Sequence, residues 1–190
     1  LFVRDTLSDW NTQAADSLTI TRVAGPDTPR RTERELIAQA TALIPEYAAF
    51  WHQLPKTFRA KIGFKTNAFD PPERRKGGWG FIANSHFEIA DDEAFVFTAD
   101  PKAAPYHAVL IGNHWWIAMD ADRRSGAFNT SQARANRDGT ITYVIATRDP
   151  GVHNWLDTGG LHTGIIQVRW QGTPPEMMEM PEAINGGQLV

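Results

Sequence analysis

Short runs in which apolar and polar residues alternate restrict the fold of this chain more than any other feature. From Trp79 to Ile89 one face carries Phe81, Ala83, Ser85, Phe87 and Ile89, and the other carries Ile82, Asn84, His86 and Glu88. A period of two is typical of a β-strand with one buried face. Similar runs predict strands over 94–98, 106–119, 141–146 and 165–170.

Turn residues separate these runs. Asp91-Asp92 predicts that strand 94–98 is the hairpin partner of the run before it. Asp138-Gly139 is a strong hairpin signal ahead of 141–146, because glycine readily adopts the positive φ that a tight turn needs. Both signals favour antiparallel pairing.

The first part of the chain predicts two strands and then a helix. Leu1–Leu7 is rich in apolar residues and Ser17–Val23 alternates, so both are predicted to be strands. Thr32 and Glu35 have the spacing of a capping box, which marks a helix start. Apolar residues then recur at three- and four-residue steps, namely Leu36, Ala40, Leu43, Tyr47, Phe50 and Leu54. We expect this stripe to be buried in the core, and Pro45 to kink the helix or split it in two.

Six to nine short strands, with a turn signal about every ten residues, predict a mainly β fold. We expect a jelly-roll-like antiparallel β-sandwich with one long, Pro-kinked helix or a helix pair near the N-terminus. A single β-sandwich domain should cover 1–170, with a helical insertion at 32–54. Residues 171–190 should form an extended C-terminal tail.

Charge and composition argue against several functions. A net charge of -3 gives no electrostatic reason to bind nucleic acid or an anionic membrane. No apolar run approaches the ~20 residues of a membrane-spanning helix. The sequence has no cysteine, which suits a reducing cytoplasm, the expected location. Glycine motifs that bind phosphate or dinucleotides are absent, so no cofactor is expected.

Histidine spacing predicts no metal site. None of the six histidines form His-x-His or lie four residues apart, as strand and helix metal motifs require. A site assembled from distant strands would use His86, His114, His153 and Asp157. An unpaired histidine is more often a hydrogen-bonded polar residue than a metal ligand.

The loop from Arg148 to His162 holds the densest group of polar side chains, between two predicted strands. Loops held on a rigid β scaffold often carry functional residues. Arg148 can pair with Asp149 or grip a carboxylate, and His153 or His162 can transfer a proton near neutral pH. The predicted catalytic residues are Arg148, Asp149, His153 and Asp157.

The predicted ligand-binding residues come from this loop and from the run that starts at Asn113, with Trp116 and Trp155 as an aromatic wall. They are Asn113, His114, Trp115, Trp116, Asp120, Arg124, Asn129, Asn154, Trp155 and His162. A structural interpretation also fits the loop. Asp149-Pro150-Gly151 would make a turn, Asn154 and Asp157 would cap backbone groups, and Trp155 would close the end of the sandwich.

These residues resemble those of a bacterial family, DUF1214, whose activity is uncharacterised. The likeness rests on Asn113-His114-Trp115 with Asp120, Asp138-Gly139, Arg148–Gly151, Asn154–Thr158 and Arg169-Trp170, and extends to Phe2–Arg4, Asp9-Trp10 and Arg22-Val23. It implies a jelly-roll sandwich in the C-terminal half of a longer protein, in line with a chain that begins at Leu1. Thr147 and Leu161 stand where the family tends to have histidine, so a catalytic histidine at those points would not carry over.

Three functions fit these observations. The first is an enzyme or enzyme half that acts on a small hydrophobic or hydroxylated molecule at the loop 148–162. The second is a non-catalytic module that binds a sugar or similar ligand by stacking on its tryptophans. The third is a structural domain that packs, through tryptophans and the Met177–Met180 cluster, on its own missing N-terminal half or on an identical subunit.

Overall fold

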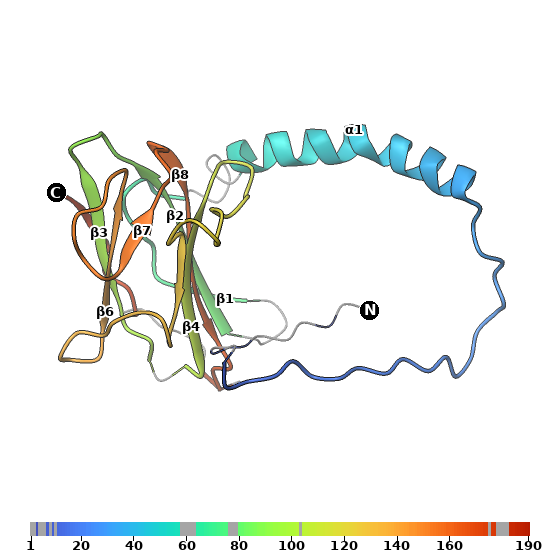
Figure 1. Cartoon of the computed structure of the whole chain (residues 1–190), viewed down its shortest axis with the longest axis horizontal. Helices are drawn as coiled ribbons and strands as arrows, with labels where there is room; N and C mark the ends of the chain where they lie inside the picture. Colours follow the sequence, from blue (N-terminus) through green and yellow to red (C-terminus); the bar gives the residue numbers. More distant parts are fainter. Residues whose placement is uncertain are drawn as a thin grey trace. The chain divides into compact units, whose positions relative to one another are not determined.

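The structure is a computed structural model that describes residues 3, 7, 9, 11–57, 64–75, 80–102, 104–174, 176–177 and 183–190. The chain forms two compact units, Leu1–Lys56 and Thr57–Val190 (Figure 1). Among the described residues, no helix is both long enough and apolar enough to cross a membrane.

The C-terminal unit is a β-sandwich of two sheets. The first sheet consists, from edge to edge, of β1 (Glu73–Arg74), β2 (Gly80–Glu88), β8 (Thr163–Gln171), β4 (Tyr106–Gly112) and β5 (Ala127–Asn129). The second consists of β7 (Trp155–Asp157), β6 (Ile141–Ala146), β3 (Ala94–Ala99) and β9 (Gln188–Leu189). The strand pairs of both sheets are antiparallel, apart from the parallel pair of β6 and β7.

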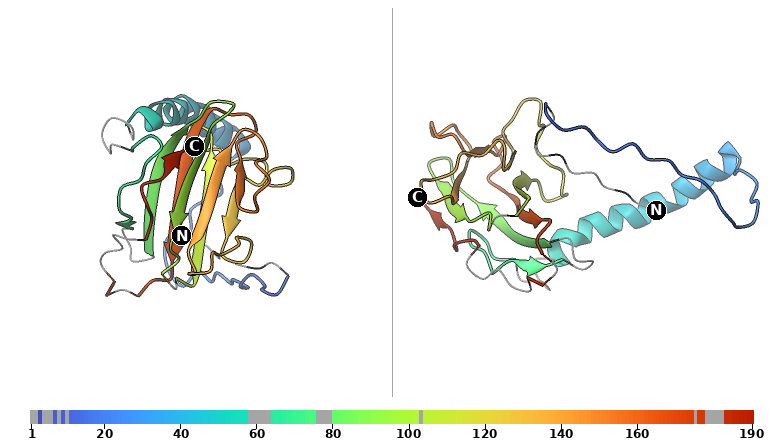
Figure 2. Two further views of the ribbon diagram at one scale, coloured as in Figure 1. Left: turned by 90° about the vertical axis from the view of Figure 1, so that its left-hand side faces the viewer. Right: turned by 90° about the horizontal axis from the view of Figure 1, so that it is seen from below.

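The order of the strands is jelly-roll-like, as the sequence predicts. The chain passes from β2 in the first sheet to β3 in the second and back to β4 in the first (Figure 2). The long strand β8 then lies between β2 and β4 and pairs with both. Strands that exchange between two packed sheets are typical of this class of sandwich.

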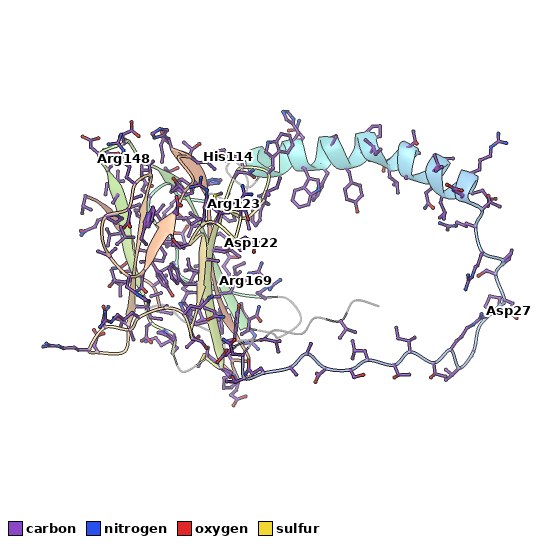
Figure 3. The ribbon with its side chains drawn as sticks, viewed as in Figure 1. Asp27, His114, Asp122, Arg123, Arg148 and Arg169 are labelled. Carbon is purple, nitrogen blue, oxygen red and sulfur yellow. The ribbon has the colours of Figure 1, made fainter. Side chains whose placement is uncertain are left out.

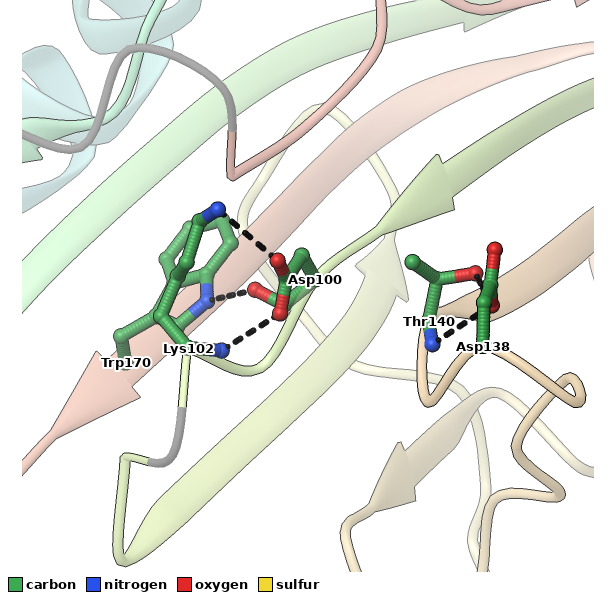
Figure 4. Close-up of polar contacts among 5 residues, drawn as sticks. All are labelled: Asp100, Lys102, Asp138, Thr140 and Trp170. Atoms are coloured by element: carbon green, nitrogen blue, oxygen red, sulfur yellow. Dashed lines mark hydrogen bonds and ion pairs between the residues drawn. The ribbon is translucent and has the colours of Figure 1, made fainter.

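Strand alternation decides which side chains fill the space between the sheets. The largest fully buried side chains of the strands are Phe81, His86, Phe87, Phe95, Phe97, Ile111, Tyr143, Ile145, Leu156, Ile165, Ile166 and Trp170, and all of these except His86 and Ile165 belong to the core between the sheets. The predicted inner face of β2 is therefore confirmed. Trp170 also donates its indole N–H to the Asp100 carbonyl oxygen at 2.8 Å, and Lys102 binds the Asp100 carboxylate (Figure 4).

Two titratable groups are buried in this core. His107 on β4 and Tyr143 on β6 are fully buried, with ring centroids 6.3 Å apart. Among the described residues, neither ring nitrogen of His107 nor the Tyr143 hydroxyl has a hydrogen-bond partner. Burial lowers the pKa of His107 to about 4, although the Arg169 backbone and the Asp100 carboxylate favour its charged form. Burial also raises the pKa of the Tyr143 hydroxyl.

Two strand predictions are wrong in their pairing or length. β3 is not the hairpin partner of β2, because it pairs with β6 and β9 in the other sheet. The run predicted over 106–119 ends at Gly112. Its end is caused by Asn113, whose side-chain oxygen accepts the backbone N–H groups of Trp115 and Ile117 at 2.9 and 3.2 Å and starts a turn.

Two further strand predictions are also corrected. The turn at Asp138-Gly139 exists, with Gly139 at φ 86°, but no hairpin forms because the strand before it, β5, pairs with β4. Ser17–Val23 has no regular structure and is exposed. Alternation alone makes no strand without a neighbouring strand to take up its hydrogen bonds. Most of Leu1–Leu7 lies outside the described residues.

The N-terminal unit contains α1 (Glu33–Thr57), the single helix of the described residues. Its capping box is confirmed: Glu35 N–H donates to Thr32 Oγ1 at 3.3 Å, and Thr32 N–H donates to Glu35 Oε2 at 2.8 Å. The bonds from Thr32 lower the pKa of the Glu35 carboxyl. The helix is continuous through Pro45, so no helix pair forms. Nearly all of it belongs to the N-terminal unit, so it is not an insertion into the sandwich.

The large apolar residues of α1 from Leu36 to Phe50 are exposed, which corrects the expectation that the stripe fills the core, whereas Trp51 is half-buried and the side chain of Leu54 lies outside the described residues. The α1 stripe (Leu36, Ala40, Leu43, Tyr47, Phe50 and Leu54) is flanked by a second apolar column (Ile37, Ile44 and Trp51). Tyr47 and Phe50 expose 63% and 57% of their surface, and Ile44 exposes 65%. The described residues of the sandwich core all belong to the C-terminal unit.

The described C-terminal residues, 183–190, form part of the sandwich and not the expected tail. Ala183 and Ile184 are buried, and β9 pairs with β3. The edge of β3 offers unpaired backbone groups that the end of the chain can satisfy. Within the Met177–Met180 cluster, Met177 packs against the core, whereas residues 178–180 lie outside the described residues.

Candidate functional site

The loop 148–162 contains β7, and its buried polar groups hold it in place. The Asn154 amide donates to the carbonyl oxygens of Arg134 and Thr142 at 2.8 and 2.9 Å, and its oxygen accepts the Arg134 N–H at 2.8 Å. The Trp155 indole donates to the Ala146 carbonyl at 3.0 Å. Both ends of the Asn154 amide are thus engaged with backbone, as in the structural interpretation of this loop.

Asp157 is bound on both of its oxygens. Its Oδ2 lies 3.0 Å from Arg124 Nη1, and its Oδ1 accepts the Gly159 N–H at 2.8 Å. Its own N–H donates to the Ser125 carbonyl, and the Ser125 hydroxyl donates to the Trp155 carbonyl at 2.9 Å. The Asp157 side chain exposes only 12% of its surface. These contacts fasten the segment around Arg124 to β7.

A second group of charged residues lies exposed at the end of the sandwich. Arg148 Nη2 lies 3.9 Å from Asp91 Oδ2, and His162 Nε2 lies 3.7 Å from Asp91 Oδ1. His162 Nδ1 is also 3.0 Å from the Ile89 carbonyl oxygen. More than half of each of these three side chains is exposed. Such loose surface ion pairs contribute little to stability, so these groups are accessible to a ligand. We call Asp91, Arg148 and His162 the rim cluster.

A pair of histidine rings, His86 and His114, lies on the first sheet. Figure 3 shows His114 and Arg148 at the same end of the two sheets. His114 Nε2 lies 2.9 Å from Thr163 Oγ1, next in sequence to His162. The His114 ring centroid is 5.9 Å from that of buried His86, on which the Phe64 ring also packs at 5.8 Å. The structure therefore brings together two of the predicted site residues, Arg148 and His162, through Asp91.

Other predicted site residues stabilise turns. Asn113, Asp120, Asn129 and Asp149 each accept, with a side-chain oxygen, the backbone N–H of the residue two positions later. Such local bonds are a common structural role for Asn and Asp. His153 is exposed, with its ring nitrogen 3.2 Å from the Gln132 carbonyl oxygen. Trp115 is half exposed, and Trp116 has a φ of 63° in the turn.

The described residues contain no group of three or more His, Asp or Glu side chains that could hold a metal ion. His86, His114, His153 and Asp157, considered as ligands of a site from distant strands, therefore do not form one. The catalytic roles of Arg148, Asp149, His153 and Asp157 stay predictions.

Asp157→Ala is expected to lower the free energy of unfolding by about 1 to 3 kcal/mol, because Arg124 and the Gly159 N–H lose their acceptor. Arg148→Ala is the matched control and should change it by less than about 0.5 kcal/mol, since its ion pair is exposed. Urea denaturation of both variants measures the difference. Equal, small effects would show that Asp157 does not hold the loop.

A row of polar residues on the outer face of the first sheet was not predicted as a site. Gln167 donates to Asn84 Oδ1 at 3.2 Å, and Arg169 donates to Gln167 Oε1 at 3.1 Å. Burial raises the pKa of Tyr106, and the neighbouring charge of Arg169 opposes that shift. The alternation of 82–88 and 165–170 would have placed these residues on one face. Asn84, Gln167 and Arg169 of this row are thus linked to one another by hydrogen bonds.

The α1 stripe is the second feature that the sequence analysis did not identify as a site. Its residues follow steps of 4, 3, 4, 3 and 4 along α1, which is the spacing of a helix–helix seam. Glu46, Tyr47, Phe50 and Trp51 also line an open hollow of about 440 Å³. The spacing was visible in the sequence, but it was assigned to the core.

Comparison with known proteins gives matches among solved structures. A crystal structure of an uncharacterised protein from Burkholderia cenocepacia matches 66% of this chain at 31% identity with a TM-score of 0.56, over 35% of its own chain. The VPA0106 protein from Vibrio parahaemolyticus matches 55% at 15% identity with a TM-score of 0.41, over 30% of its own chain. This chain thus spans about a third of the length of these proteins. No family model and no curated protein matches the sequence.

Proposed function

We propose that this chain is a β-sandwich domain that docks onto another protein surface through the α1 stripe. The observation that carries the proposal is the exposure of a continuous apolar face on a long helix. Six large apolar side chains, from Leu36 to Phe50, each leave 41% or more of their surface exposed. Single exposed apolar residues are ordinary on soluble proteins, but a contiguous exposed patch of this kind marks an interaction site.

The length of α1 gives the face its size. A helix of 25 residues is about 37 Å long, since each residue adds about 1.5 Å. The α1 stripe and the column at Ile37, Ile44 and Trp51 together form an apolar band, whereas Gln39, Glu46 and Gln53 border its other side. A band of this width is typical of a helix that packs on other protein, and wider than a strict coiled-coil seam.

The energetics of α1 also favour a partner. Proline in a helix interior costs about 3 kcal/mol, because Pro45 has no N–H to donate and its ring crowds the preceding turn. The capping box at Thr32 offsets about 1 kcal/mol of this. Helices without tertiary packing are only marginally stable in water. Docking of the α1 stripe adds tertiary packing that stabilises the helix.

The partner surface belongs either to a longer polypeptide or to a second copy. The Burkholderia cenocepacia protein is much longer than the part this chain matches, so the remainder of such a protein is available as a partner in cis. The resemblance to the DUF1214 family, in which this chain would be a C-terminal half, supports the same source. The identical subunit is the alternative.

Replacement of Leu43 and Phe50 by glutamate is expected to lower the fluorescence of a bound apolar dye, such as anilinonaphthalene sulfonate, more than about twofold. The dye is added to the chain diluted until sedimentation shows a monomer. Ala42→Glu with Ala49→Glu is the matched control, because both residues lie on the opposite side of α1 and add the same charge. If the two double variants bind dye equally, the α1 stripe is not an accessible apolar surface.

A second candidate function is the binding of a small anionic molecule at the rim cluster. The specific observation is that Arg148 and His162 are both more than half exposed and both lie within 4 Å of Asp91. An arginine beside a histidine suits a carboxylate near neutral pH. Arg148→Ala, whose stability should be unchanged, is the variant with which ligand binding here is tested.

A further inference from the structure

We infer that the surface that covers the α1 stripe is the α1 stripe of a second copy, packed antiparallel. This inference rests on the proposed docking function of α1. Six residues of the stripe are spaced symmetrically about position 45. In an antiparallel pair centred there, residue 36 faces 54, residue 40 faces 50, and residue 43 faces 47 of the other copy. Every stripe position therefore meets another stripe position, as a closed two-fold dimer requires.

Side-chain size is complementary in this register. The smallest residue of the stripe, Ala40, faces one of the largest, Phe50 of the second copy. Leu43 faces Tyr47 in the two layers beside the axis. Large side chains opposite small ones fill the space between two helices without overlap or void. A register shifted by one heptad would place Phe50 opposite Tyr47 and lose this match.

The apolar column beside the stripe is symmetric about position 44, one residue from the centre of the stripe. Columns that flank an antiparallel seam meet the same column of the partner, so Ile44 lies beside Ile44 of the second copy, and Ile37 lies beside its Trp51. The other border places Glu46 near Glu46 of the second copy, where two like charges weaken the pair slightly. An unrelated partner would give Glu46 no such neighbour.

The exposed area suits a dimer of moderate strength. The six large side chains of the band offer on the order of 600 Å² per helix. A standard stable interface uses about 800 Å² per partner, and smaller interfaces belong to weaker complexes. We therefore expect association in the micromolar range, with Leu43 and Tyr47 at its centre.

Sedimentation equilibrium of the whole chain tests the pairing. The wild type should reach a dimer in the micromolar range, and Leu43→Glu should weaken the dimer at least about 100-fold, because two buried layers are lost in each dimer. Ala42→Glu, on the opposite side of α1, should leave the dissociation constant unchanged. Glu46→Gln should tighten the dimer about twofold, since it removes the like-charge contact.

Pulsed electron spin resonance tests the orientation. The chain has no cysteine, so Arg34→Cys carries a single spin label. The antiparallel pair places the two labelled positions about 33 Å apart along the axis, whereas a parallel pair places them about 10 Å apart. A distance near 10 Å, or a dimer that Leu43→Glu leaves intact, overturns the inference.

A chain that stays monomeric overturns the self-pairing in a way that is distinct from failure of the docking function. A monomer whose dye binding still depends on Leu43 and Phe50 keeps an accessible α1 stripe, which another polypeptide then covers. A monomer whose dye binding is insensitive to both residues contradicts both proposals.

Discussion

Replacement of Trp170 by alanine is expected to lower the free energy of unfolding of the sandwich by about 3 to 5 kcal/mol. Trp170 is fully buried and lies opposite Phe81 in the β2–β8 pair. Its ring packs on His107 at 5.1 Å between centroids, and its N–H binds the Asp100 carbonyl. The variant loses this packing and leaves a cavity between the sheets. Because small domains are stable by only about 5 to 15 kcal/mol, the loss is a large part of the total.

Trp115→Ala is the matched control for this experiment. Trp115 exposes 50% of its surface in a turn, so its loss should change the free energy of unfolding by less than about 1 kcal/mol. Urea denaturation followed by circular dichroism measures both variants. Similar losses for Trp170 and Trp115 would contradict the assignment of Trp170 to the core and of Trp115 to the surface.

Acid is expected to destabilise the folded protein by about 3 kcal/mol between pH 6.5 and pH 4, through His107 alone. Burial lowers the pKa of His107 from 6.5 to about 4 in the folded protein. In this window the unfolded chain takes up a proton that the folded protein does not. The free energy of unfolding therefore falls as the pH falls. Above about pH 6.5 His107 is neutral in both the folded and the unfolded state, so it no longer lowers the free energy of unfolding.

The control for the pH effect is a variant without a titrating group at this position. His107→Phe keeps an aromatic ring beside Trp170 and should lose the slope of stability between pH 6.5 and 4. His153→Gln removes an exposed histidine and should keep it. Asp138 and Glu35, whose pKa values are also lowered, have ordinary values of 3.8 and 4.5, so their effect falls mostly below the window. A wild-type protein with flat stability from pH 6.5 to 4 contradicts the burial of His107.

Local pattern was enough to predict the strands and much of their orientation. The alternation around Phe81 and Phe87 predicted the inner face of β2, because residue period and strand pleat are the same local property. The pairing of strands, in contrast, is not a local property of the sequence. β3 follows β2 through a short turn yet joins the opposite sheet, and the register of two packed sheets depends on contacts between residues far apart in sequence. The parallel strand β7 was missed because three residues carry no periodicity.

The polar loop and α1 show that local pattern alone does not predict the role of a residue either. Asn154 and Asp157 could be read as capping residues or as site residues, and only coordinates reveal that both are bonded to neighbouring segments. The stripe from Leu36 to Phe50 predicted correctly that one face of α1 is apolar. It did not reveal what covers that face, since burial in a core and docking on a second surface require the same spacing.

The most direct test of the docking function is amide hydrogen exchange of α1 measured over a series of protein concentrations. Protection of residues 36–50 should rise with concentration and stay low in Leu43→Glu, whereas protection of β8 should stay constant in both. Protection of α1 that is already complete at the lowest concentration, and unaffected by Leu43→Glu, would contradict the claim that docking of the α1 stripe stabilises this helix.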